Sequence, residues 1–212
     1  MKGKEKISKQ SPVFLRVAIF CVGWVLKLFL RYKVINGDAV PKTGAYLLAS
    51  NHISGSDPII MVLAQKKRCL HFMAKAELFK NPIIAFVLAK LGAFPVHRGA
   101  GDSKAVNLAQ ELLKMGEAEV IYLEGTRSKD GEFLKPKSGA AMIAYSTNTP
   151  VIPVCMTKLS NKNRTIIHFG NIFTPQELGM TTGNSKEFRD ASRKIMDEIA
   201  KMRQEDLQNF CK

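Results

Sequence analysis

A chain of 212 residues, 46% of them hydrophobic, is long enough to fold around its own core, and this composition excludes a globally disordered protein. Its formal net charge of +14 favours a negatively charged partner, such as nucleic acid, anionic lipid headgroups or a phosphorylated substrate. Half of that charge lies in the first 33 residues, where eight cations and one acid give +7.

The first predicted element is a helix at residues 13–30, VFLRVAIFCVGWVLKLFL, which we expect to lie on a membrane surface. Its uninterrupted apolar run, Val17–Leu26, is shorter than the roughly 20 residues that a spanning helix needs, and cations flank both ends. At about 100° per residue, one narrow stripe of the helix holds Arg16, Gly23, Lys27 and Arg31. Such a helix directs its cations toward lipid phosphates. A buried core helix is the alternative, whereas a cleaved signal peptide would need a small-residue cleavage site after the segment.

This interpretation divides the chain into a basic, membrane-attaching part at residues 1–31 and a globular domain at residues 32–212. We expect peripheral or monotopic attachment to the cytoplasmic face of the cell membrane. The cysteines are far apart and form no C-x-x-C pair, which favours reduced thiols over disulfides or a metal site. They are Cys21, Cys69, Cys155 and Cys211.

From residue 32 onward, short runs rich in β-forming residues alternate with segments of helical pattern. The predicted strands are Tyr32–Ile35, Tyr46–Ala49, Leu70–Met73, Ala93–Val96, Val120–Leu123, Val151–Met156 and Thr165–Phe169. The predicted helices are Pro58–Gln65, Pro82–Leu91, Ser103–Met115, Ser138–Thr147 and Lys186–Phe210, with Asp57, Asn81 and an Asn184-to-Glu187 pattern as caps. This alternation predicts an α/β domain with a mixed, largely parallel sheet flanked by helices.

A histidine and an aspartate stand five residues apart, directly after the second predicted strand. They are His52 and Asp57 in the segment NHISGSD, residues 51–57. The glycine and serines between them favour a turn that would bring the two side chains together. A carboxylate there holds one tautomer of the imidazole and stabilises the imidazolium that forms when the ring takes a proton. The spacing alone also fits a surface histidine and a helix-capping aspartate, so both interpretations stay open at this point.

Further polar residues follow other predicted strands. Arg98 and Gly99 end the segment FPVHRG, where a guanidinium and backbone N–H groups can approach a phosphate together. The segment EGTRS, residues 124–128, adds a glycine and a second guanidinium, and its glutamate can hold an arginine or meet an acceptor hydroxyl. Lys75 comes directly after a third strand. Ligands gather at the carboxyl ends of strands in α/β sheets, so this conjunction predicts a site for an anionic ligand.

The order NHISGSD, FPVHRG, EGTRS and VIPV (residues 151–154) resembles the four-block pattern of the glycerolipid acyltransferases. It is most similar to that of the 1-acylglycerol-3-phosphate (lysophosphatidate) acyltransferases. The resemblance runs from about residue 33 to 160 and includes MAKAEL around Lys75 and PKSGAA around Lys137. It implies a glycerol-3-phosphate acyltransferase-like fold, with the N-terminal helix at the membrane interface. The VIPV block fits either an acyl groove or, more simply, a core strand.

The resemblance also implies a role for each matching residue. His52 would act as the general base toward the acceptor hydroxyl, and Asp57 would orient the ring and stabilise its charge. The acceptor phosphate would be held by Lys75, Arg98, Gly99, Glu124, Gly125, Thr126 and Arg127. Acyl-CoA or acyl carrier protein would donate the acyl group to the sn-2 hydroxyl of 1-acylglycerol 3-phosphate, forming phosphatidate. The resemblance implies no cofactor and no metal, and the variable His97 receives no role.

Other functions fit the same motifs or the same charge. The acceptor can instead be glycerol 3-phosphate, another lysophospholipid or an amine-containing lysolipid, and a thioesterase would use the same base on water. A non-enzymatic basic protein that coats anionic membranes fits the charge alone. Nucleic acid is disfavoured as a partner because the chain has no finger, basic-zipper or RNP-like pattern. The choice between the two acyl donors stays open.

Overall fold

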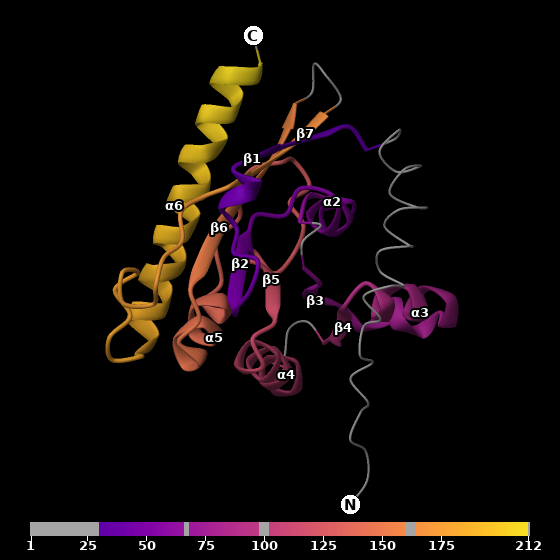
Figure 1. Ribbon diagram of the computed structural model, residues 1–212, viewed down its shortest axis with the longest axis vertical. Helices are drawn as coiled ribbons and strands as arrows, with labels where there is room; N and C mark the ends of the chain where they lie inside the picture. Colours follow the sequence, from indigo (N-terminus) through magenta and orange to yellow (C-terminus); the bar gives the residue numbers. More distant parts are fainter. Residues whose placement is uncertain (1–29, 66–67, 98–101, 160–163, 212) are drawn as a thin grey trace, which may run out of the picture.

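The computed structural model describes residues 30–65, 68–97, 102–159 and 164–211, arranged as one twisted sheet with helices on both faces (Figure 1). The predicted helix at 13–30 lies outside this part of the chain, apart from its last residue. The strands are β1 (Tyr32–Ile35), β2 (Tyr46–Ser50), β3 (Leu70–Lys75), β4 (Ala93–Val96), β5 (Ala118–Tyr122), β6 (Val151–Leu159) and β7 (Arg164–Phe169). The helices are η1 (Gly37–Ala39), α2 (Asp57–Ala64), η2 (Ala76–Lys80), α3 (Pro82–Lys90), α4 (Ser103–Lys114), α5 (Gly139–Thr147) and α6 (Ser185–Phe210).

The seven strands follow the order β1-β7-β6-β2-β5-β3-β4. Neighbours from β6 to β4 pair in parallel, whereas β7 runs antiparallel to β6 and β1 pairs in parallel with β7. The predicted fold class, a mixed and largely parallel sheet flanked by helices, is therefore confirmed. Every residue of the central strand β2 is buried, which is typical of a strand covered on both faces.

Two apolar cores lie on the two faces of the sheet, and alternate residues of β2 belong to each. Leu47 and Ala49 pack into the core covered by α4, α5 and α6. Tyr46 and Leu48 point the other way, into the core covered by α2. This alternation is the period of two that a strand imposes on its side chains. Within the described ranges, no helix combines the length and apolar character that crossing a bilayer requires.

The predicted helix caps are confirmed at two positions and wrong at one. The Asn81 side chain accepts hydrogen bonds from the first turn of α3, and the Asn184 side chain does the same for α6. Asp57, in contrast, is the first residue of α2 and makes no cap bond along it, and Ser56 stands at the cap position. The reason is that the Asp57 carboxylate turns back toward the loop that precedes the helix.

A glutamate is buried in the middle of the sheet, and we expect it to make folding stability fall as pH rises. Burial raises the pKa of Glu119 in β5 from 4.5 to about 8. The folded chain therefore keeps a proton there that the unfolded chain loses, so the free energy of unfolding should fall between those two pH values by up to about 1.4 kcal/mol per unit. In Glu119→Gln this contribution should vanish. Chemical denaturation at several pH values across the window measures both slopes.

The control for this stability prediction is Glu111→Gln, which changes an exposed carboxyl on α4 and should leave the slope as in the wild type. Equal slopes in the wild type and in Glu119→Gln would contradict the assignment of the proton to Glu119.

Candidate active site

A tight turn after β2 brings His52 and Asp57 into contact. His52 Nδ1 lies 2.8 Å from Asp57 Oδ2, and the backbone N–H groups of Ile53 and Ser54 donate to the same oxygen at 2.7 and 2.8 Å. The Asp57 side chain is 1% exposed and that of His52 is 12% exposed. A histidine whose Nδ1 donates to a carboxylate keeps its lone pair on Nε2. The turn therefore holds an imidazole in the tautomer that can accept a proton from a ligand.

The segment after β5 fixes His52 from two further directions. Glu124 Oε1 accepts a hydrogen bond from the His52 backbone N–H at 3.1 Å, and Glu124 Oε2 accepts one from Leu134 N–H at 3.1 Å. The Ser128 N–H donates to the His52 carbonyl at 2.9 Å. Burial raises the pKa of Glu124, although these N–H groups act in the opposite direction. Since both its oxygens are engaged with the backbone, Glu124 connects the strand ends of β2 and β5.

Tyr122, the last residue of β5, stacks on the imidazole of His52. The ring centroids are 4.1 Å apart and the planes differ by 21°. Burial, with the Asp57 carboxylate as a second cause, holds the pKa of Tyr122 well above 10, so this phenol stays neutral. The sequence assigns no role to Tyr122, because a stacking contact between residues of two distant segments leaves no spacing signal in either one.

Cationic side chains approach this turn from the segments that follow it. A Cβ built on Gly55 would lie 3.2 Å from Arg127 Nη1, so the Arg127 guanidinium lies over the turn. A Cβ on Gly125 would lie 2.8 Å from Lys137 Nζ, and Gly125 adopts a positive φ of 66° that a larger residue would strain. Lys137 is thus a second cation beside the site, one to which the motifs assign no role beyond its place in the PKSGAA segment.

The other residues predicted to hold the phosphate do not all lie beside the His52 turn. Thr126 is exposed next to Arg127. Lys75 ends β3 half-exposed, with Nζ 3.4 Å from Glu77 Oε1. Arg98 and Gly99 lie outside the described residues. The structure therefore brings together His52, Asp57, the Glu124 block and Lys137, whereas Lys75 pairs with its own neighbour.

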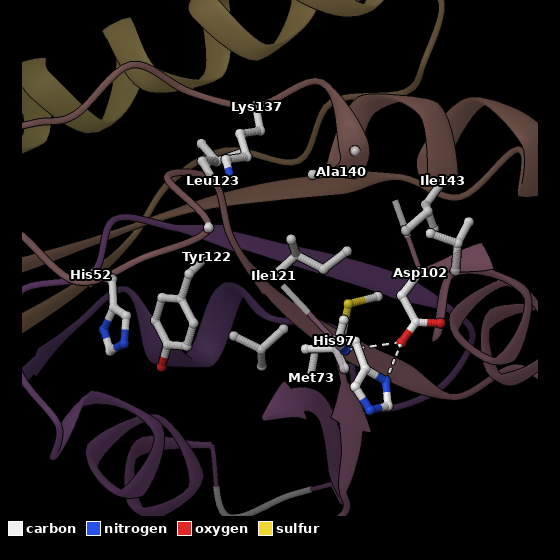
Figure 2. A pocket seen from close by; sticks show the side chains of 15 residues that line it. His52, Met73, His97, Asp102, Ile121, Tyr122, Leu123, Lys137, Ala140 and Ile143 are labelled. Carbon is white, nitrogen blue, oxygen red and sulfur yellow. Dashed lines mark hydrogen bonds and ion pairs between the residues drawn. The ribbon is translucent and has the colours of Figure 1, made fainter. Parts of the chain in front are cut away.

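An apolar cavity of about 330 Å³ opens directly beside His52 (Figure 2). Its apolar wall consists of Met73, Val96, Val106, Val120, Ile121, Leu123, Ala140 and Ile143. Figure 2 shows His52 and Tyr122 at one end and a second pair, His97 and Asp102, at the other. His97 Nδ1 lies 3.2 Å from Asp102 Oδ2, but the His97 side chain is 77% exposed. A hydrocarbon chain fits such a wall, because burying apolar surface is favourable.

The VIPV block does not belong to this cavity. Val151, Ile152 and Val154 are buried in β6, as the core-strand interpretation expects. Among the described residues, no group of three His, Cys, Asp or Glu side chains converges as metal ligands would.

Comparison with known proteins places these residues in a family context. Residues 31–157 match the family model described as Acyltransferase. The chain is 33% identical over 129 residues to a 1-acyl-sn-glycerol-3-phosphate acyltransferase of Bacillus subtilis, covering 61% of this chain and 64% of that protein, just under two thirds. With the protein of that name from Streptococcus pneumoniae it is 27% identical over 203 residues, covering 92% of this chain and 74% of the other.

A solved structure has the same fold. It is the 1-acyl-sn-glycerophosphate (LPA) acyltransferase PlsC from Thermotoga maritima, which matches with a TM-score of 0.67 over 97% of this chain and 83% of that chain, at 24% identity. At that identity the match shows the fold alone.

Proposed function

The chain belongs to the acyltransferase family, and on this premise we propose that it transfers a fatty acyl group from a thioester to the sn-2 hydroxyl of 1-acylglycerol 3-phosphate, forming phosphatidate. One observation supports the proposal above all others. His52 Nδ1 is held 2.8 Å from the buried Asp57 carboxylate, and the ring lies at the mouth of an apolar cavity. The names of the bacterial relatives point to the same acceptor.

His52 acts as the general base in this mechanism. Its Nε2 takes the proton of the acceptor hydroxyl while that oxygen attacks the thioester carbonyl. The Asp57 carboxylate stabilises the resulting imidazolium, since the two groups lie in hydrogen-bond contact. The carbon–sulfur bond then breaks, and the proton passes from Nε2 to the leaving thiolate. The acyl group moves directly to the acceptor, without an acyl-enzyme intermediate.

Arg127 and Lys137 supply positive charge for the acceptor phosphate, and Arg98 with Gly99 completes this group in the proposal. A phosphate needs several converging cations, and a guanidinium can form two parallel bonds to it. Glu124 acts differently from the cations around it. Its carboxylate would repel a phosphate, whereas its two bonds to backbone N–H groups place it as a positioning residue for His52.

Replacing Arg127 with alanine should raise the KM for the lysophosphatidate acceptor by about 10–100-fold, with a much smaller effect on kcat. The reason is that a hydrogen bond to a charged group contributes about 1.5–3 kcal/mol. Steady-state kinetics with varied acceptor and saturating donor measures both constants. Lys129→Ala, two residues further along and exposed, is the matched control and should behave as the wild type. An acceptor KM unchanged in Arg127→Ala would remove this residue from the phosphate site.

A panel of acceptors with one labelled acyl donor tests the proposed function as a whole. Lysophosphatidate should be acylated faster than glycerol 3-phosphate, lysophospholipids with larger headgroups, or an amine-containing lysolipid. The product should be a diacyl lipid, since release of free fatty acid would indicate a thioesterase. Acyl-CoA and acylated carrier protein, supplied in parallel, identify the donor. A preference for an acceptor without a phosphate would overturn the proposal.

The reaction takes place at a membrane surface in this proposal, because the acceptor is a lipid. The predicted helix at 13–30 would attach the chain from the cytoplasmic side, with its cations toward anionic headgroups. Vesicle binding by the full chain, compared with a variant in which Arg16 and Lys27 are replaced by glutamate, examines this part separately from catalysis.

A further inference from the structure

The helix α3 is apolar and yet has no fully buried residue, and Leu88 packs against the core only partly buried. Each of its nine residues, PIIAFVLAK, is at least partly exposed to solvent. Ile83 is 74% exposed, Phe86 58%, Val87 49% and Ile84 43%, and Leu78 in the preceding η2 is 46% exposed. Among the described residues, five of the nine exposed large apolar side chains thus fall between positions 78 and 87. Single exposed apolar residues are common, but a contiguous group of them indicates an interaction surface.

The exposed side chains of α3 form one broad face. At about 100° per residue, Phe86, Ile83, Val87 and Ile84 span an arc of roughly 160°. The partly buried apolar residues of the helix, Ala85, Leu88 and Ala89, lie on the opposite side. Figure 1 shows α3 beyond the edge strand β4, on the side of the sheet farthest from α6. This apolar face is therefore directed away from the domain.

Two lysines accompany this surface, one between Leu78 and Ile83 and one after Val87. Lys80 ends η2, and Lys90 ends α3 with its Nζ 5.6 Å from the centre of the Phe86 ring. Long cationic side chains next to an apolar face are suited to a lipid surface, where the chain stem lies along the hydrocarbon and the charge meets the headgroups. Two copies of this surface facing each other would instead bring like charges together.

The surface also lies near the end of the sheet that holds the reactive histidine. The helix η2 begins directly after Lys75, at the carboxyl end of β3. His52 follows the carboxyl end of β2, and both strands pair in parallel with β5. The carboxyl ends of parallel strands lie at the same end of a sheet. η2 and the start of α3 are therefore at the same end of the sheet as the His52–Asp57 turn.

From these observations we propose that η2 and α3 insert into the headgroup region of an anionic bilayer, as a membrane contact additional to the predicted helix at 13–30. The exposed apolar side chains enter the interface, namely Leu78, Ile83, Ile84, Phe86 and Val87. Lys80 and Lys90 meet lipid phosphates. This contact turns the end of the sheet that carries His52 toward the membrane. The proposal concerns membrane attachment alone, so its outcome is independent of the proposed acyl-transfer chemistry.

The test uses the full chain and vesicles of phosphatidylcholine with and without phosphatidylglycerol. The double variant Ile83→Glu, Phe86→Glu should bind the mixed vesicles at least about tenfold more weakly than the wild type. The reason is that the free energy of burying one large apolar side chain corresponds to about a tenfold change in affinity or more. The matched control Met115→Glu, Ile172→Glu changes two exposed apolar residues elsewhere and should bind as the wild type. Lys80→Glu, Lys90→Glu should weaken binding to the mixed vesicles only.

Melting temperature and turnover in detergent distinguish loss of attachment from loss of folding or of catalysis. All variants should keep their melting temperature, and Ile83→Glu, Phe86→Glu should keep its turnover on an acceptor dispersed in detergent. Unchanged vesicle binding in that double variant would overturn the proposal. If binding is unchanged while sedimentation shows a lost dimer, a second copy covers α3. If binding is unchanged while the melting temperature falls, another segment of this chain covers it.

Discussion

Replacing His52 with alanine should lower kcat for acyl transfer by about 10²–10⁴, the usual contribution of a general base. The chain should stay folded, because the ring is at the surface of the cavity and Asp57 keeps two backbone N–H donors after the ring is removed. The loss should therefore appear in kcat, with a melting temperature close to that of the wild type. Single-turnover measurements with labelled donor follow the chemical step directly.

The chain provides a matched control for this experiment in its second His–Asp pair. His97 and Asp102 have the same five-residue spacing as His52 and Asp57, and they lie at the other end of the same cavity. The His97 side chain is 77% exposed, whereas that of His52 is 12% exposed and its backbone N–H is held by Glu124. His97→Ala should thus lose far less activity. Near-full turnover in His52→Ala, or equal losses in both variants, would reject His52 as the base.

The strands are predictable from the sequence because apolar, β-forming runs are separated by helices with recognisable first residues. Their ends are less predictable, since they depend on partners that are distant in the chain. The third strand continues to Lys75 because Ala74 and Lys75 pair with β4. The sixth continues to Leu159 because its last residues pair with the antiparallel β7. Neither partner can be recognised from the residues around the strand end.

The sequence predicts the polar motifs of the site but not the contacts between their side chains. Three motifs at strand ends are enough to expect a shared site, because the sheet is parallel there. The spacing of His52 and Asp57, however, also fits a helix cap, and only the closed turn shows that the carboxylate points backward. The stacking of Tyr122 on the imidazole and the approach of Lys137 to Gly125 depend on the packing of separate segments. Lys75 illustrates the opposite case, since its position after a strand favours the site but its ammonium group pairs with Glu77.

Glu124 shows why the geometry changes the interpretation of a motif. Within EGTRS, an acid beside an arginine suggests direct contact with the substrate. In the folded chain its carboxylate accepts hydrogen bonds from the backbone N–H groups of His52 and Leu134, so it links the segment after β5 to the His52 turn. We therefore expect Glu124 to influence the reaction through the proposed base, His52, whose backbone it holds.

Replacing Asp57 with asparagine should lower kcat by about 10²–10⁴, with little change in the KM for the acceptor. Asparagine preserves the size of the side chain, and its carbonyl oxygen can still accept hydrogen bonds from Ile53 and Ser54. What it removes is the negative charge next to the imidazolium that forms in the transition state. The KM for the acceptor should stay unchanged because this variant keeps Arg127. Kinetics at saturating donor, with melting temperature as the folding control, separates these effects.

A double variant examines whether His52 and Asp57 act as one unit. If the carboxylate works only through the ring, adding Asp57→Asn to His52→Ala should cause little further loss, since groups that act together are not additive. Multiplying losses would mean that Asp57 contributes by a separate route, for example by holding the turn over which Arg127 lies. The matched change Asp102→Asn removes an equivalent charge at the far end of the cavity, and its effect on kcat should be small. A fully active Asp57→Asn enzyme would contradict a charge-stabilised imidazolium, and the mechanism would then need another base.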